Sequence, residues 1–232
     1  MGPYKILVYL AAGTVCMLVP ILLQARWKNI TRWKSVLLAL CLTITGTIGT
    51  LLLFYFESGG KFGGTSFFGA VFLVPLIFFI GCKVFSVSFG KTMDLCASAE
   101  CVMLAVMKIR CLVSGCCAGI ELFTTSTGQQ VLFPSQSIEL LAGLAIAVAL
   151  VIMAKKEEND GTLYPWYMIL YGVTRFVLNW FRTANEPFVW FLPPGNFWSL
   201  ISILIGAVWL VAAKKIEKSK RNSIAVESKE TT

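Results

Sequence analysis

The apolar residues of this chain fall in long blocks, each about the length that a helix needs to cross a bilayer. A transmembrane helix takes about 20 predominantly apolar residues, and 57% of the 232 residues are hydrophobic. No run of residues alternates apolar and polar side chains in the way that a transmembrane barrel requires. The pattern therefore predicts an all-α integral membrane protein with seven transmembrane helices, at residues 4–23, 36–56, 66–85, 93–113, 137–154, 164–181 and 197–213.

The net charge of +8 is concentrated in alternate connections between the predicted spans. Short cytoplasmic loops of membrane proteins carry an excess of Lys and Arg, so we expect the N-terminus outside and the C-terminus in the cytoplasm. The cations do not form one basic face interleaved with aromatic residues, so we expect no nucleic-acid partner. The cations that set the orientation are Arg26, Lys28, Arg32, Lys34, Lys83, Lys91, Lys155, Lys156, Lys214, Lys215, Lys218, Lys220 and Arg221.

We expect one polytopic membrane domain over residues 1–213 and a basic cytoplasmic tail over residues 214–232. The first span could be a signal peptide, but its cations follow the apolar run and no small-residue cleavage pattern is clear, which favours a retained helix. The chain contains no histidine, and histidine is both the commonest metal ligand and the commonest general base. We expect neither a metal nor a cofactor.

The sixth predicted span carries a polar stripe in an otherwise apolar sequence. Tyr171, Arg175, Asn179 and Arg182 are spaced by four, four and three residues, which places them on one face of a helix. Such a face must turn toward other helices or toward water. The alternative for the two arginines is that their side chains extend to the outer interface of the membrane.

Charged residues of two further spans fall at a similar depth. Glu139 follows "FPSQSI" a short way into the fifth span, and Lys108 and Arg110 lie about 21 to 24 Å up the fourth span from Asp94. A carboxylate in hydrocarbon needs a cationic partner, so Glu139 could form a structural pair or act on a substrate. Because Arg and Lys are natural phosphate partners, the convergence predicts a site for an anionic headgroup from the outer leaflet.

The stretch "KIRCLVSGCCAG", residues 108–119, places thiols beside these cations. Nearby cations lower the pKa of a thiol, so Cys111, Cys116 and Cys117 could serve as a nucleophile, a redox pair or an acyl-carrying site. The alternative is that they are small residues at a helix packing face. The glycine-rich stretch "GGKFGGTSFFGA", residues 59–70, could bring backbone N–H groups to a phosphate.

These stretches together resemble the prolipoprotein diacylglyceryl transferase family, from about residue 59 to residue 213. "FPSQSIE" is similar to the family's His-Pro-Ser-Gln-Leu-Tyr-Glu, and "GGTSFFGA" to its Gly-Gly-x-Ser-Phe-His-Gly-Gly. "YGVTRFVLNWFR" is similar to its Tyr-Gly, Arg, Glu, Arg pattern, and "KIRCLVSGCCAG" lies where the family has its Arg-Ile-Gly-Asn signature. The resemblance implies a multi-pass enzyme of the bacterial cell membrane that moves a diacylglyceryl group from phosphatidylglycerol, or a similar anionic phospholipid, to the cysteine thiol of a lipoprotein precursor.

The chain also departs from the family pattern. Phe68 stands in place of a histidine, Lys108 in place of the signature arginine with Arg110 two positions on, and Asn179 in place of a glutamate. Cys111 and Cys116 replace the signature asparagine and glutamate. A homologue that acts on another acceptor, or a lipid-binding or transport protein without catalysis, is therefore an alternative to the family's reaction.

The resemblance and the clustered polar groups together define the expected site. Arg175, with Lys108 or Arg110, would hold the phosphate, since cations must stabilise the charge that develops on it. Glu139 is the remaining candidate for a base, and Tyr171 would orient the substrate. The residues expected to bind substrate are Lys108, Arg110, Gln136, Arg182, Asn179 and Gly119.

Overall fold

The computed structural model describes residues 3–27, 30–61, 63–115, 119–156, 160–182 and 187–230. Over these residues the chain forms seven helices, which confirms the predicted fold class. Two short strands, β1 (Glu121–Thr124) and β2 (Gln130–Leu132), form an antiparallel hairpin between the fourth and fifth predicted spans. The helices are α1 (Pro3–Ala25), α2 (Arg32–Glu57), α3 (Phe68–Val84), α4 (Phe89–Ser114), α5 (Ser135–Lys156), α6 (Leu163–Asn179) and α7 (Pro194–Glu230).

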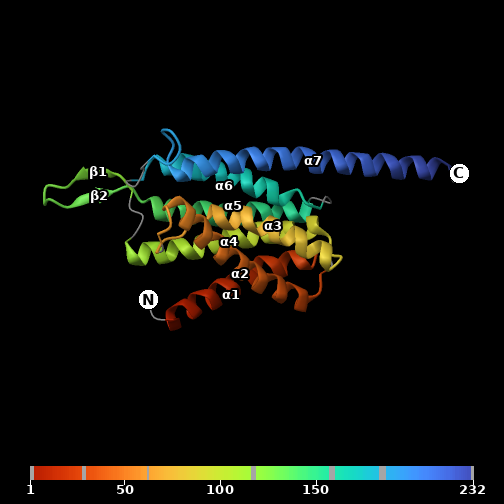
Figure 1. Cartoon of the computed structure of the whole chain (residues 1–232), viewed down its shortest axis with the longest axis horizontal. Coiled ribbons are helices and arrows are strands. Elements are labelled where there is room, and N and C mark those ends of the chain that lie inside the picture. The colour runs from red at the N-terminus through yellow and green to blue at the C-terminus, as the bar shows by residue number, and fades with distance from the viewer. Residues whose placement is uncertain are drawn as a thin grey trace.

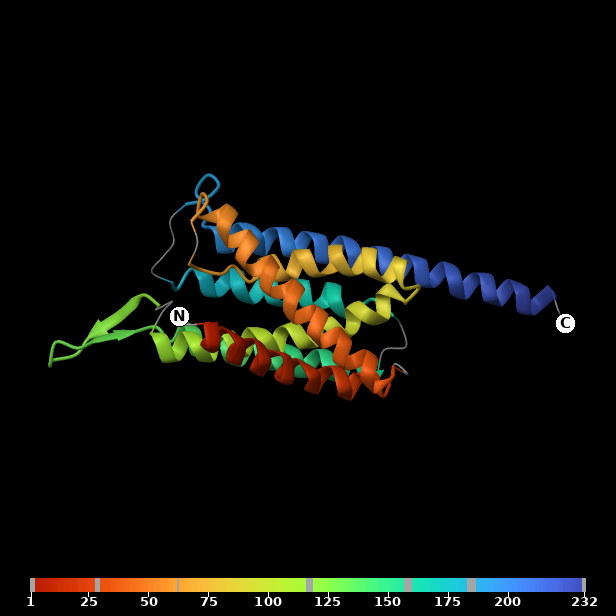
Figure 2. The same cartoon turned by 60° about the horizontal axis from the view of Figure 1, so that its bottom comes forward.

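The helices run back and forth along one long axis (Figure 1). The hairpin projects from one end of the bundle, and α7 extends from the other. Because helix direction alternates, the connections α1–α2, α3–α4 and α5–α6 lie at the end from which α7 extends. Figure 2 shows α2 crossing the bundle obliquely, from the side of α1 to the side of α3 and α7.

Apolar and polar helices take different places in the bundle. Among the described residues, α2, α5 and the Pro194–Ile216 part of α7 are long and apolar enough to cross a membrane, and α3 and the Leu10–Ala25 part of α1 are shorter apolar helices. The less apolar α4 is packed against α1, α3, α5 and α6. This arrangement keeps Asp94, Ser98, Glu100 and Lys108 of α4 away from lipid, where unsatisfied groups would cost several kcal/mol.

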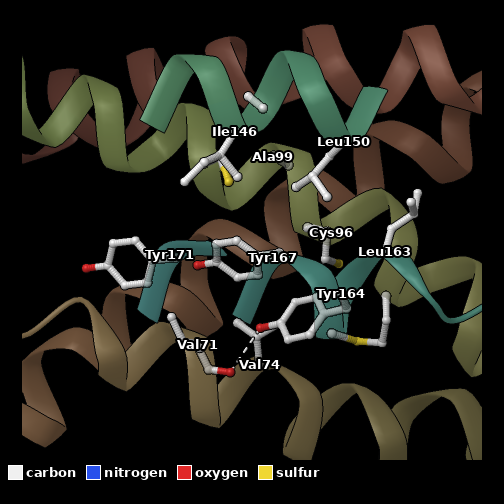
Figure 3. Packing of buried hydrophobic residues seen from close by; sticks show 14 of the residues in the cluster. Val71, Val74, Cys96, Ala99, Ile146, Leu150, Leu163, Tyr164, Tyr167 and Tyr171 are labelled. Carbon is white, nitrogen blue, oxygen red and sulfur yellow. Dashed lines mark hydrogen bonds between the residues drawn. The ribbon is translucent and has the colours of Figure 1, made fainter. Parts of the chain in front are cut away.

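Tyrosines of α6 fill much of the core (Figure 3). Tyr164, Tyr167 and Tyr171 are buried against residues of α3, α4 and α5. The Tyr164 hydroxyl lies 3.0 Å from the carbonyl oxygen of Val71 (Figure 3). It also lies 3.1 Å from a carboxylate oxygen of Glu100, so one phenol joins α6 to both α3 and α4.

A glycine contact fixes where α2 and α3 cross. A Cβ added to Gly69 would lie 1.9 Å from the carbonyl oxygen of Gly49, and one added to Gly49 would lie 2.4 Å from that of Gly69. Only glycine permits such a close approach of two backbones. Next to this crossing, Ser66 N–H donates to the Thr50 carbonyl oxygen at 3.0 Å, which holds the segment before α3 against α2.

The first turn of α6 is held by α4. The Asp94 carboxylate accepts hydrogen bonds from the backbone N–H groups of Gly161 and Leu163, both at 2.9 Å. A carboxylate at a helix N-terminus satisfies unpaired N–H groups and complements the helix dipole. Asp94 therefore fixes the position of α6 along α4, and with it the depth of every polar residue on α6.

Several helix ends differ from the apolar windows. α4 begins at Phe89, four residues before its predicted span, and α6 ends at Asn179, two residues before the end of its span. α7 continues to Glu230, through the residues expected to form a separate tail. Lys, Glu and Arg are good helix formers, so the loss of apolar character after residue 213 does not end the helix.

Candidate functional site

A cavity of about 280 Å³ opens near the end of the bundle that carries the hairpin. Its walls come from the end of α2, the segment before α3, the second half of α4, the end of α6 and the start of α7. Small-molecule sites typically measure roughly 300–1,000 Å³, so this cavity has room for a lipid headgroup but not for its acyl chains.

Four charged side chains, from α4, α5, α6 and the segment after α6, meet beside the cavity. The Glu139 carboxylate of α5 forms ion pairs with the Lys108 ammonium of α4 and with the Arg175 guanidinium of α6. Arg182 Nη1 lies 3.7 Å from the same carboxylate. The side chains are between 6% and 16% exposed, so the cluster is largely removed from solvent.

The charges of this cluster do not balance. Lys108, Arg175 and Arg182 carry three positive charges against the one negative charge of Glu139, which leaves a net charge of +2. The three cations line the cavity, whereas Glu139 is not among its lining residues and lies behind them. The cavity wall is therefore positive, and an anion inside it would meet charge-assisted hydrogen-bond donors.

The two arginines of the polar stripe reach the cavity in different ways. Arg175 lies within α6, but Arg182 lies three residues beyond the end of that helix. Arg182 is placed by backbone pairing with Gly119, and Ile120 N–H donates to the Phe181 carbonyl oxygen at 3.0 Å. The alternative that Arg182 extends to the outer interface does not fit, since its side chain is 13% exposed and lies beside Glu139.

Gly119 has a backbone role in this arrangement. It is buried, and an added Cβ would lie 2.3 Å from the Phe133 carbonyl oxygen. A side chain at this position would push the base of the hairpin away from the end of α6 and so displace Arg182. Gln136, in the first turn of α5, is half-buried and is not among the residues that line the cavity.

Lys108 and Arg110 are separated by the rotation of α4. Lys108 is buried and lines the cavity, whereas Arg110 is exposed and is not among the lining residues. Two residues along a helix correspond to a rotation of about 200°, so both side chains cannot face the same cavity. Of the two predicted phosphate partners, the structure places Lys108 at the site.

Of the remaining predicted residues, Tyr171, Asn179 and Cys111 line the cavity. Tyr171 lines the cavity, and its ring centroid lies 5.4 Å from that of Phe67 and 5.1 Å from that of Phe68. Asn179 also lines the cavity, and its amide donates to the Asn196 side chain at the start of α7. Cys111 is half-buried in the cavity wall. Cys116 and Cys117 lie outside the described residues.

Glu57, which the sequence motifs did not point to, lines the cavity from the last position of α2. The Ser66 hydroxyl donates to Glu57 Oε1 at 2.7 Å. In the sequence, Glu57 could have been recognised as an acidic residue at the end of an apolar span, directly before the glycine-rich stretch. No group of three or more His, Cys, Asp or Glu side chains suited to a metal ion occurs in the part of the chain that the structure describes.

Comparison with known proteins gives the same family as the sequence motifs. The family model described as prolipoprotein diacylglyceryl transferase matches residues 2–212. A phosphatidylglycerol–prolipoprotein diacylglyceryl transferase of Clostridium tetani is 26% identical over 153 residues, which is 62% of this chain and 61% of that protein. The corresponding transferase 2 of Clostridium perfringens is 29% identical over 125 residues, covering 49% of this chain and 48% of that protein.

A third relative, from Dehalococcoides mccartyi, is 22% identical over 166 residues, covering 67% of this chain and 64% of that protein. The chain thus spans about half to two thirds of the length of the curated relatives that it matches. The family model, in contrast, covers nearly the whole chain. The chain therefore belongs to the prolipoprotein diacylglyceryl transferase family, a bacterial family of multi-pass membrane enzymes.

Proposed function

We propose that this protein transfers a diacylglyceryl group from phosphatidylglycerol to the cysteine thiol of a lipoprotein precursor, at the outer leaflet of the cell membrane. The observation that carries the proposal is the positive wall formed by Lys108, Arg175 and Arg182 in a cavity of headgroup size. The names of the relatives supply the donor and the acceptor, since they are transferases that act on phosphatidylglycerol and prolipoprotein.

The reaction that this site would perform needs positive charge beside the phosphate that leaves. The thiol sulfur forms a bond to a glyceryl carbon, and the bond from that carbon to the phosphate oxygen breaks. Negative charge therefore grows on the leaving phosphate, and cations fixed beside it stabilise the transition state more than the ground state. Arg175 offers the planar fork of donors that matches phosphate, and Lys108 adds a compact charge.

Glu139 serves this chemistry as a positioning residue. Its two carboxylate oxygens hold Lys108 and Arg175, so it orients the cations and compensates part of their charge. A carboxylate in this position is poorly placed to take a proton from a substrate, because it lies behind the cations and outside the cavity lining. This role differs from the general base that the sequence alone suggested.

The positions of the cationic connections support a cavity that opens toward the outer leaflet. The cations of the α1–α2, α3–α4 and α5–α6 connections lie at the end of the bundle opposite the hairpin. The positive-inside rule assigns that end to the cytoplasm, so the cavity would open toward the outer leaflet. A thiol acceptor that has been exported could then reach the cavity without crossing the membrane again.

One observation favours a second candidate, a lipid-binding protein of this family without catalysis. Phe68 takes the place of the family's histidine, and its ring packs against Phe72 at 6.0 Å and Tyr171 at 5.1 Å. A phenyl ring at this position cannot transfer a proton, as the family's histidine could. Such a protein would bind the anionic headgroup and leave the lipid intact.

The test is transfer by the purified protein in liposomes that contain phosphatidylglycerol. A peptide with a single cysteine in a lipoprotein-precursor motif is the acceptor, and mass spectrometry detects the diacylglyceryl thioether. We expect the parental protein to form this product and the Arg175→Ala variant to be at least about 100-fold slower, since removal of one such charge stabiliser costs roughly that factor.

The matched control is Arg32→Ala, which removes an exposed arginine at the opposite end of the bundle and should leave the rate within about twofold. An Arg175→Ala variant that transfers lipid at the parental rate would contradict the proposed site. Phosphatidylglycerol binding without any product from the parental protein would support the non-catalytic candidate instead.

A further inference from the structure

Transfer to a thiol needs a group that accepts the thiol proton, because the thiolate is the nucleophile. The chain contains no histidine. Glu139 has both carboxylate oxygens in ion pairs and does not line the cavity. The proton acceptor must therefore be another side chain of the cavity wall.

Glu57 is the one carboxylate among the described residues that line the cavity. It ends α2 and is half-buried, so its carboxylate is neither sealed in the core nor fully in water. The other side chains of the wall that can exchange a proton are poorer acceptors at neutral pH. They are the Thr65 and Ser66 hydroxyls, the Tyr171 phenol, the Cys111 thiol and the Lys108 ammonium.

The Glu57 carboxylate is held in place by the fold. The Ser66 hydroxyl donates to Oε1 at 2.7 Å, and Ser66 itself is fixed because its backbone N–H donates to the Thr50 carbonyl oxygen at 3.0 Å. The Gly49–Gly69 contact brings the two helices together beside this hydrogen bond. A carboxylate oriented by a hydroxyl from a rigid crossing has the arrangement that a general base requires.

Glu57 also shares the cavity with the cations. Lys108, Arg175 and Arg182 line the same space of about 280 Å³. A phosphate bound to these cations and a thiol beside Glu57 would thus be confined in one small volume. The confinement brings the sulfur close to the glyceryl carbon and replaces a bimolecular encounter with a fixed geometry.

We propose that Glu57 is the general base of the transferase, and this inference rests on the proposed function. The Glu57 carboxylate takes the proton from the acceptor thiol, and the sulfur forms the C–S bond to the glyceryl carbon. The C–O bond to the phosphate breaks, and the glycerol phosphate leaves with the electron pair. Glu57 then returns the proton to that phosphate or to water, so that the carboxylate is regenerated and no co-reactant is needed.

The experiment compares two acceptors with the purified, liposome-inserted protein and its Glu57→Gln variant. One acceptor is a lipobox peptide with its cysteine, and the other is a peptide that carries an aromatic thiol already ionised at neutral pH. We expect Glu57→Gln to slow transfer to cysteine at least about 100-fold, the usual contribution of a general base. The loss should be less than about tenfold with the ionised thiol, which needs no base. Glu57→Asp should recover part of the rate to cysteine.

The matched control is Glu121→Gln, the same carboxylate-to-amide change at an exposed position of β1 outside the cavity lining. It should transfer to both acceptors at the parental rate. If Glu57→Gln slowed transfer to both acceptors by the same factor, Glu57 would have a structural role and the inference would be overturned. A Glu57→Gln variant that transfers to cysteine at the parental rate would also overturn it. If the unmodified protein transfers to neither acceptor, the proposed function itself fails, and the role of Glu57 fails with it.

Discussion

Glu139 of α5 and Arg175 of α6 form a buried ion pair that holds the guanidinium at the wall of the cavity. The same carboxylate pairs with Lys108 of α4, so one side chain joins three helices at one depth. Removing two charges from water costs several kcal/mol per ion, and close pairing recovers that cost only while both partners remain. The pair therefore makes the positive wall possible and makes it dependent on Glu139.

Replacing Glu139 should destabilise the bundle. In Glu139→Gln, the buried charges of Lys108 and Arg175 lose their counterion, which should lower the free energy of unfolding by about 3–5 kcal/mol. Thermal denaturation in detergent measures this as a fall in melting temperature. The exposed Glu121→Gln variant is the control and should melt with the parental protein. Equal melting of all three proteins would show that the ion pair does not stabilise the bundle.

Lys108 and Arg110 should differ sharply in their effect on transfer. Lys108→Ala removes a cation from the cavity wall and should slow transfer by at least about tenfold, whereas Arg110→Ala removes an exposed charge and should change the rate by less than about twofold. Initial rates with the cysteine peptide, at matched amounts of inserted protein, measure both. The opposite order would mean that α4 is rotated relative to the structure.

The glycine contact between α2 and α3 should tolerate no side chain. Gly69→Ala places a methyl group where the Gly49 carbonyl oxygen lies 1.9 Å away, so the helices must separate, and strain of this kind costs about 1–3 kcal/mol. Gly81→Ala, in the same helix with open space around the added methyl, should not destabilise the protein. Denaturation in detergent compares the two, and equal stability would contradict the close crossing.

Cys111 should react with water-soluble maleimide, and phosphatidylglycerol should protect it. Its thiol lies in the cavity wall, whereas Cys96 and Cys101 are buried in the core and should remain unmodified. The measurement is peptide mass spectrometry after labelling, with Cys116 and Cys117 replaced by serine so that their adducts do not interfere. Labelling of Cys111 that is unchanged by the lipid would argue that the headgroup binds elsewhere.

The spans and part of the site could be predicted from the sequence, because they depend on residues that are close together in the chain. Length and apolar character decide whether a segment can cross a bilayer, and the helical period decides which residues share a face. Tyr171, Arg175 and Asn179 could therefore be assigned to one stripe, and all three line the cavity. The same period could not decide between Lys108 and Arg110, because that choice depends on how α4 is rotated against its neighbours.

The resemblance to the transferase family guided the assignment of Glu139 as a base, but the structure gives it different surroundings. A sequence does not record that two cations from separate helices occupy both of its oxygens. Glu57 could not be assigned to the site from the sequence, because only the tertiary structure brings it there. Glu57 is distant in sequence from the other charged residues of the site and joins them only because α2 crosses obliquely to the cavity end of the bundle.

The sequence by itself determined that this chain is a seven-helix membrane protein with cations and a carboxylate at one depth, since these properties depend on residues within single helices. The tertiary structure alone decided that Lys108, Arg175 and Arg182 surround Glu139, and that Glu57 shares their cavity. Those contacts depend on the rotation, depth and crossing of the helices. The Asp94 cap on α6 and the Gly49–Gly69 contact fix them, through interactions between residues far apart in the chain.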